Sequence, residues 1–315
     1  MEKKFVSTVF YLNNDEKVID NFLELVVPTI TNNFEQYEFI FVNDGCEDGT
    51  LFHIKEYMQR INLRGVVSII HMGFHQGIEA AMNAGRDASI GDFVYEFDSV
   101  LGDYKAELIL DAYKKLISGY DIVSASVNEK ERLSSRAFYK VFNKNSKIKM
   151  KLGTESFRIV SRRAINRIKS IGSHIPYRKA VYASCGLNTT NLKYESTISI
   201  QDKKKLEKES ESNFSRGTNA VNYLIYFTNV MSKVSIIISA LFFLVFLGIV
   251  IYALGDYFMN GSAIEGWTST ITFISFGFLG IFIMLTIILK YLSVLLDLIF
   301  KKQKYLVSDI EKIVG

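Results

Sequence analysis

The sequence predicts an α/β protein in which an open sheet, wound with helices on both faces, is followed by a two-helix transmembrane hairpin. Within residues 1–125, short apolar runs alternate with stretches whose apolar residues recur at helical spacing. The runs are continuously apolar, which is typical of parallel strands buried on both faces of a sheet. Toward the C-terminus, two uncharged stretches of 21 and 20 residues have the length of a helix that crosses a bilayer.

The composition weighs against several classes of protein. The 315 residues include 37 Lys and Arg against 33 Asp and Glu, so the charge balance does not indicate a nucleic-acid binder. Two cysteines and four histidines are too few for a disulfide framework or a metal-rich protein. The glycine-rich dinucleotide motif and the P-loop lysine motif are both missing from the sequence, which argues against an NAD enzyme and a P-loop NTPase.

Strands and helices are expected to follow one another in strict alternation. We predict strands at 5–11, 37–42, 65–70, 92–97 and 121–124, and helices at 16–31, 49–60, 77–87 and 105–118. Ligands of such sheets bind beyond the carboxyl ends of the strands. The segments after the first four strands are polar, and they read LNND, NDGCEDGT, HMGFHQG and DSVLGD. Asp44, directly after the second strand, is well placed to accept a hydrogen bond from a nucleobase or a ribose hydroxyl.

The two uncharged stretches, 234–254 and 270–289, predict transmembrane helices. The loop between them carries no Lys or Arg, whereas Lys233 precedes the first stretch and four lysines, at 290, 301, 302 and 304, follow the second. By the positive-inside rule, we expect a multi-pass protein of the inner (cytoplasmic) membrane with both termini in the cytoplasm. The flanking segments, 216–233 and 290–315, mix apolar and basic residues at near-helical spacing, as helices lying on the inner leaflet do. A solvated helix packed on the soluble domain is the alternative.

Four segments carry a resemblance to a known family. They are VNDGCEDGT at 42–50, the stretch from His71 to Ser99, LSSRAFYKVFN at 133–143, and SFRIVSRRA starting at Ser156. Together they resemble family 2 glycosyltransferases with the GT-A fold, a Rossmann-like open sheet. The closest resemblance is to the membrane-anchored polyprenyl-phosphate branch, which includes dolichol-phosphate mannose synthase and bactoprenol glucosyltransferase. It implies a GT-A domain over 1–215, with a nucleotide-sugar half at 1–125 and an acceptor half at 126–215.

The resemblance also implies roles for individual residues. Asp44 would bind the nucleotide base, with Asn14 and Asp15 lining the same pocket. Asp98 would be the catalytic first aspartate of a D-x-D element, which holds Mg²⁺ or Mn²⁺ against the donor diphosphate. On the acceptor side, four residues would contact phosphate: Ser135, Arg136, Arg158 and Arg162.

The sequence departs from the family pattern at two places. The D-x-D element reads Asp98-Ser99-Val100, and valine cannot ligate a cation. Glu96 and Asp103 are the nearby carboxylates that could replace the second aspartate as metal ligands. The other departure is SASV at 124–127, where close relatives usually have an arginine.

The absence of an expected base points to the acceptor. Transfer to a hydroxyl normally needs a general base, and no Glu-Asp pair occupies 150–190, where the family places it. A phosphate monoester, with a second pKa of about 6, is already largely ionised at neutral pH. We therefore expect a hexosyltransferase that moves a sugar, with inversion, from a nucleotide sugar to polyprenyl phosphate. The sugar, the nucleotide and the oligomeric state, a homo-oligomer included, stay open.

Two other functions remain compatible with the sequence. An enzyme of the same fold could glycosylate a lipid-linked sugar hydroxyl in surface-polysaccharide assembly, with Glu155 or Asp103 as its base. Alternatively, Val100 fits a catalytically silent homologue that serves as a binding partner in a membrane glycosylation complex.

Overall fold

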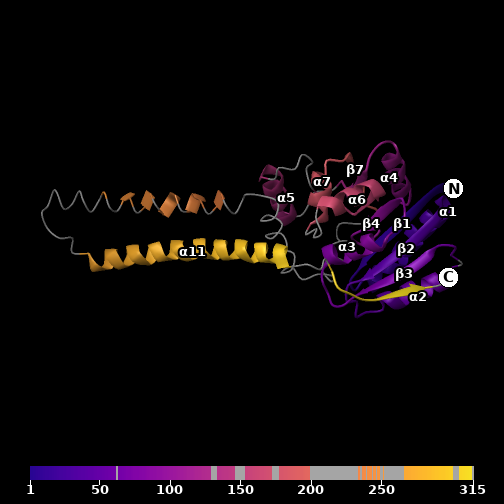
Figure 1. Ribbon diagram of the computed structural model, residues 1–315, viewed down its shortest axis with the longest axis horizontal. Coiled ribbons are helices and arrows are strands. Elements are labelled where there is room, and N and C mark those ends of the chain that lie inside the picture. Colours follow the sequence, from indigo (N-terminus) through magenta and orange to yellow (C-terminus); the bar gives the residue numbers. More distant parts are fainter. Residues whose placement is uncertain are drawn as a thin grey trace. The chain divides into compact units, whose positions relative to one another are not determined.

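The computed structural model describes most of the N-terminal two thirds of the chain and part of the remainder (Figure 1). The described residues are 1–61, 63–128, 133–145, 153–171, 177–198, 266–300 and 305–313, with short stretches of one to three residues between 233 and 251. The chain divides into two compact units. The first comprises 1–143, 148–217 and 302–315, and the second 144–147 and 218–301.

The first unit contains an open mixed sheet, whose described strands run in the order β7-β5-β6-β4-β1-β2-β3-β8. The strands are β1 (Glu2–Leu12), β2 (Phe34–Asn43), β3 (Val66–Met72), β4 (Phe93–Phe97), β5 (Ile122–Val127), β6 (Phe157–Ser161), β7 (Thr189–Tyr194) and β8 (Val307–Ile313). The helices of this unit are α1 (Glu16–Asn33), α2 (Thr50–Arg60), α3 (Ile78–Ala88), α4 (Glu107–Ile117), α5 (Leu133–Asn145), α6 (Arg162–Ile171) and α7 (Arg178–Ser184). The predicted α/β open sheet is confirmed, and each strand and helix predicted within residues 1–125 is present with only its ends shifted.

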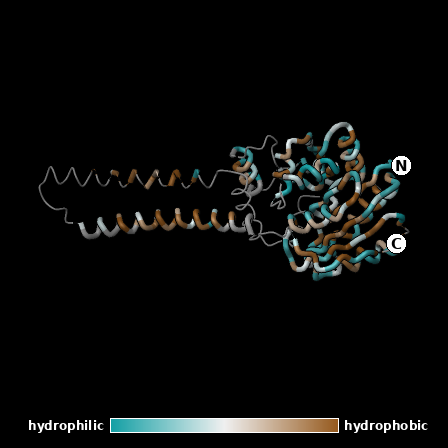
Figure 2. Tube along the Cα trace, viewed as in Figure 1, coloured by the Kyte–Doolittle hydropathy of each residue, from teal (hydrophilic) through white to brown (hydrophobic). Residues whose placement is uncertain are grey.

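The central strands β1, β2 and β4 are mostly apolar and buried over most of their length because both faces of the sheet are covered (Figure 2). On one face, Phe10 of β1 stacks on Phe41 of β2 at 4.7 Å and on Phe97 of β4 at 5.2 Å between ring centroids. On the other face, Val9 and Val42 pack under α3. Full burial of a side chain of this size contributes about 1.5–3 kcal/mol, so the double cover accounts for much of the stability of the sheet.

Helix α3 lies very close to the sheet because Gly85 faces it. A Cβ atom at this position would lie 2.3 Å from Cγ1 of Val9 and 2.7 Å from Cγ2 of Val42. The helix therefore rests directly on β1 and β2, and its N-terminus is held at their carboxyl ends, where the candidate site is built.

Strand β6 reverses direction within the sheet. It pairs antiparallel with both β4 and β5, whereas β1, β2, β3 and β4 are parallel to one another. Phe157 therefore lies opposite Phe97 at the carboxyl end of β4, and Ser161 lies opposite Phe93 at its amino end. Residues at the start of β6 face the predicted functional edge, and residues that follow its end do not.

The C-terminal residues form a strand where a helix was expected. Strand β8 pairs antiparallel with β3, with Val67 opposite Ile313 and Ile70 opposite Ile310. Glu311 of this strand forms an ion pair with Lys55 of α2 at 2.8 Å. The pairing supplies hydrogen-bond partners to the edge of β3, which would otherwise be left open.

The second unit contains α11 (Trp267–Phe300), where Phe276 packs against the ring of Phe242 at 4.9 Å. Among the described residues, no helix combines the length and the apolar composition needed to cross a bilayer. The prediction of transmembrane helices at 234–254 and 270–289, and of a multi-pass inner-membrane protein, is therefore wrong. A span needs about 20 consecutive apolar residues. Of the helix predicted at 216–233, all but Lys233 lies outside the described residues.

Candidate active site

The loops after β1, β2 and β3 meet at the carboxyl edge of the sheet, where Asp44 connects them. Its carboxylate accepts hydrogen bonds from the backbone N–H groups of Gln76, at 2.7 Å, and Gly77, at 2.8 Å, and from the hydroxyl of Tyr11, at 3.1 Å. The Asp44 side chain is fully buried. The two amides immediately precede α3, so the negative charge also lies at the positive end of that helix. Asp44 therefore holds the N-terminus of α3 at the end of β2.

Asn14 and Asp15 lie in the same group of loops. Asn14 has a positive φ of 57°, a conformation that asparagine tolerates better than most residues. Its Oδ1 accepts a hydrogen bond from the backbone N–H of Glu47 at 2.8 Å. The backbone N–H of Asp15 donates to Oγ1 of Thr50 at 2.8 Å. The structure thus brings the three predicted nucleotide-binding residues to one edge, and their contact with a base stays a prediction.

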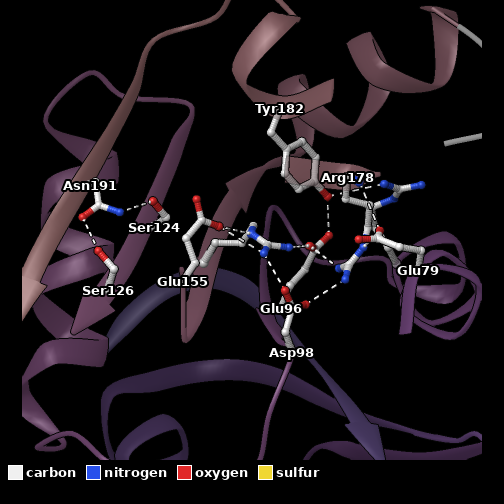
Figure 3. A network of polar contacts seen from close by, with 11 residues as sticks. Glu79, Glu96, Asp98, Ser124, Ser126, Glu155, Arg178, Tyr182 and Asn191 are labelled. Carbon is white, nitrogen blue, oxygen red and sulfur yellow. Dashed lines mark hydrogen bonds and ion pairs between the residues drawn. The ribbon is translucent and has the colours of Figure 1, made fainter. Parts of the chain in front are cut away.

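A second group of polar residues surrounds Asp98, at the carboxyl end of β4 (Figure 3). Arg158 of β6 donates to Glu96 at 2.8 Å and to Oδ2 of Asp98 at 2.6 Å. Arg178, the first residue of α7, donates to Glu96 at 2.7 Å and to Oδ1 of Asp98 at 2.8 Å. We call these four residues the carboxylate–arginine cluster. Each guanidinium bridges both carboxylates, and each oxygen of Asp98 has a guanidinium partner.

Other side chains complete the bonding of the cluster. Nε of Arg178 donates to Glu79 of α3 at 2.8 Å, and Nε of Arg158 donates to Glu155 at 3.1 Å. The hydroxyl of Tyr182 donates to Oε1 of Glu96. The backbone N–H of Arg178 also donates to Glu79, at 3.1 Å, which satisfies one of the free amides at the start of α7. The cluster thus joins β4 and β6 to α3 and α7.

The electrostatics of the cluster keep its members charged. Burial opposes the ionisation of Asp98, but the guanidinium groups of Arg158 and Arg178 outweigh it and hold the Asp98 pKa well below its usual range. The Glu96 pKa is lowered in the same way, against its burial, chiefly by Arg178 and then by Arg158. Burial would lower the pKa of Arg178, but Asp98 and Glu79 raise it overall. Both carboxylates and both arginines are therefore ionised at neutral pH.

A small pocket adjoins the cluster between α7 and the strands β5 and β7. It is lined by Ile122, Ser124, Glu155, Arg158, Lys179, Tyr182, Ala183, Thr189 and Thr190. At its sheet side, Nδ2 of Asn191 donates to Ser124 at 2.8 Å, and Ser126 donates to Oδ1 of Asn191 at 2.7 Å (Figure 3). The SASV segment thus places the hydroxyl groups of Ser124 and Ser126 against Asn191 at the sheet side of this pocket.

Three other predicted site residues lie elsewhere, or their side chains are not described. Arg162 follows β6, at the amino end of β4, and its Nε donates to the backbone oxygen of Gly91 at 2.9 Å. Arg136 is exposed on α5, and the Ser135 side chain lies outside the described part of the chain. The reversed direction of β6 explains the first case, because it turns Arg158 toward Asp98 and carries Arg162 to the opposite end of the sheet.

Sequence reasoning missed Arg178, Glu79 and Tyr182. Arg178 is 80 residues from Asp98 in the chain, and its segment, RKAVYAS, matches none of the motifs that drew attention to the other sites. A lone arginine at the start of a short apolar helix was the only available signal. Glu79 lies inside the recognised stretch from His71 to Ser99, but its position suggested only a favourable charge in the first turn of a helix.

The cluster does not fit the divalent ion that the resemblance implies. Mg²⁺ and Mn²⁺ need several oxygen ligands around one point. Both oxygens of Asp98 are engaged by guanidinium groups, and Val100 is fully buried. Glu96 is engaged by the same arginines, and Asp103 accepts a hydrogen bond from Tyr194 of β7 at 2.6 Å. Within the described ranges, no group of three or more His, Cys, Asp or Glu side chains is arranged to hold a metal.

Comparison with solved structures reports a likeness to the mannosyltransferase PcManGT from Pyrobaculum calidifontis, in complex with GDP-Man and Mn²⁺. That likeness has a TM-score of 0.47 and a sequence identity of 12%, and it covers 96% of this chain and 89% of the other.

Comparison with known protein sequences identifies relatives at higher sequence identity. An uncharacterised glycosyltransferase of Synechocystis sp. is 26% identical over 311 residues, covering 97% of this chain and 95% of that protein. The bactoprenol glucosyl transferase of Shigella phage SfX is 28% identical over 200 residues, covering 61% of this chain and 64% of that protein. The sequence model described as glycosyl transferase family 2 matches residues 8–169, just over half of the chain. The chain therefore belongs to glycosyltransferase family 2 and is a transferase enzyme.

Proposed function

We propose that this glycosyltransferase moves a sugar from a nucleotide-diphosphate sugar to a polyprenyl phosphate. The name of the Shigella phage relative supports the choice of lipid, since it states transfer of glucose to bactoprenol. In the proposed reaction, an acceptor phosphate oxygen bonds to C1 of the sugar from the face opposite the leaving group. The bond between C1 and the donor diphosphate oxygen breaks, and the nucleoside diphosphate leaves with the electron pair.

The charge state of the carboxylate–arginine cluster is the observation that carries this proposal. A general base for a hydroxyl acceptor must be able to take up a proton at the working pH. The Asp98 pKa and the Glu96 pKa are both lowered, and each carboxylate receives guanidinium hydrogen bonds. Such carboxylates are weak bases. An acceptor that is already ionised, such as a phosphate monoester with a second pKa of about 6, needs no base.

A second candidate, transfer to a hydroxyl, is favoured by one observation. Glu155 lines the pocket beside Arg158, and only its Oε2 atom bonds to that arginine. An acceptor hydroxyl in this pocket would find Glu155 as the carboxylate available to accept its proton. The two candidates therefore differ in the expected importance of Glu155.

Paired acceptors test the proposal. We expect the purified full chain to transfer sugar from UDP-glucose or GDP-mannose to polyprenyl phosphate but not to the matching polyprenol. The rate should fall as the pH drops below about 6, because the acceptor phosphate loses its second ionisation. Assays with Mn²⁺ and with a chelator belong in the same series. Faster transfer to polyprenol, abolished by Glu155→Gln, would replace this proposal with the second candidate.

A further inference from the structure

The C-terminal segment makes a specific contact with the loop between β3 and α3. Leu306, just before β8, uses only its backbone for it. Its carbonyl oxygen accepts hydrogen bonds from the backbone N–H of Gly73, at 2.9 Å, and from Nε2 of Gln76, at 2.7 Å. Its backbone N–H donates to Oε1 of Gln76 at 2.9 Å. The amide side chain of Gln76 thus pairs with the backbone of Leu306 through both of its polar atoms.

The same glutamine also contacts Asp44, through its backbone. Its N–H donates to Oδ1 of Asp44 at 2.7 Å, and the N–H of Gly77 donates to Oδ2 at 2.8 Å. Gly77 has a positive φ of 87°, a conformation that needs glycine, so the chain turns sharply between these amides and α3. The position of Gln76 therefore determines where the two amides meet the Asp44 carboxylate.

We propose that Gln76 and the backbone of Leu306 position the nucleotide end of the donor site, so that the chain at Leu306, just before β8, supports that site. This inference rests on the proposed transfer from a nucleotide sugar and on the predicted role of Asp44 and its neighbouring loops in binding the nucleotide. Gln76 is a positioning residue in this scheme: it acts through the loop that meets Asp44. No motif reveals the contact, because Leu306 takes part only through its backbone and its side chain is exposed.

Other contacts hold α3 in place without this pair. Gly85 packs the helix against Val9 and Val42, and the hydroxyl of Tyr305 donates to Asp87, near the end of the helix, at 3.3 Å. Removing the Gln76 side chain should therefore loosen the loop while the helix and the sheet keep their positions. This separates a positioning role from a merely structural one, since binding should change more than stability.

Two substitutions test the contact. In the full-length protein, Gln76→Ala removes two of the three hydrogen bonds to Leu306. We expect the Kd for UDP or GDP, and the KM for the nucleotide sugar, to rise about three- to tenfold, the range that corresponds to one or two net hydrogen bonds. The kcat should stay within about twofold, and the thermal midpoint should change little. Leu306→Pro removes one donor and should act in the same direction.

A matched control comes from the same C-terminal strand. Ser308→Ala removes the hydrogen bond from Ser308 to the backbone oxygen of His71, at 3.0 Å, without touching Gln76. It should leave Kd and KM unchanged. Equal Kd values for Gln76→Ala and the wild type, or an equal rise in Ser308→Ala, would overturn the inference. A wild type that binds nucleotide but does not glycosylate polyprenyl phosphate contradicts only the proposed acceptor, whereas one that binds neither UDP nor GDP overturns both proposals.

Discussion

Arg158 and Arg178 each make three side-chain hydrogen bonds to carboxylates, and both are almost fully buried. The planar guanidinium suits this arrangement because its N–H groups point in fixed directions and can bridge two acceptors at once. A buried charge destabilises the fold unless an opposite charge pairs with it. Removing one member of the cluster therefore leaves the charges of its partners buried and unpaired. The cluster therefore stabilises the fold only when all four of its charged residues are present.

Replacement of one arginine should therefore destabilise the protein strongly. Arg178→Gln removes one of the two guanidinium groups that neutralise Glu96 and Asp98. We expect a loss of about 3–5 kcal/mol in the free energy of unfolding. Arg178→Lys restores the charge without the bridging geometry, so its loss should be smaller. Urea denaturation followed by circular dichroism measures both. Arg64→Gln, at an exposed position, is the control, and an Arg178→Gln variant as stable as this control would contradict the expected cost of the unpaired carboxylates.

At the scale of elements, the direction of β6 and the short distance between α3 and the sheet determine which side chains of the cluster come into contact. Glu96 and Arg158 are directly opposite each other on β4 and β6, at the distance where cross-strand pairs interact. Glu79 reaches Arg178 because α3 lies close to the sheet. The approach of this helix therefore contributes to the cluster as well as to the core.

The closeness of α3 depends on Gly85. Gly85→Ala would place a Cβ within 2.3 Å of Val9 and 2.7 Å of Val42, so the helix or the strands must move. We expect a loss of about 1–3 kcal/mol, typical of overpacking, together with weaker nucleotide binding as the start of α3 shifts. Gly277→Ala is the control, since a Cβ there meets no atom within 4 Å, and it should leave stability unchanged or slightly raised. Wild-type stability of Gly85→Ala would show that the interface accommodates a methyl group.

At the scale of the whole molecule, the first unit is assembled from distant parts of the chain. Residues 302–315 belong to it, although residues of the second unit precede them in the sequence. Strand β8 covers the edge of β3 along its length. An open edge of this kind exposes unpaired backbone groups and promotes association between molecules.

Deletion of residues 302–315 should therefore have two effects. We expect a loss of about 2–4 kcal/mol in the free energy of unfolding, from several ladder hydrogen bonds worth about 0.5–1.5 kcal/mol each. We also expect self-association through the bare edge of β3, which sedimentation velocity detects. A protein lacking only residues 314–315 is the control. A shortened protein that stays monodisperse, with an unchanged urea midpoint, would show that β8 adds nothing to the sheet.

Local patterns in the sequence were enough to predict the strands and helices of the first half, because periodicity and burial on both sheet faces leave a direct mark on the order of apolar residues. They also located the polar loops at the strand ends, with Asp44 and Asp98 among them. The prediction of transmembrane helices, which rested on the same kind of local apolar count, was wrong.

Three features depended on the tertiary structure. The direction of β6 placed Arg158 and Arg162 at opposite ends of the sheet, although they are only four positions apart in the sequence. The pairing of Arg178 with Asp98, 80 residues away, came from the packing of α7 against β4. The bond between Leu306 and Gln76 joins residues 230 positions apart. The sequence by itself determined the elements of residues 1–125 and the family, since both are encoded in contiguous residues, but contacts between distant segments follow from strand order and helix packing, which no local pattern records.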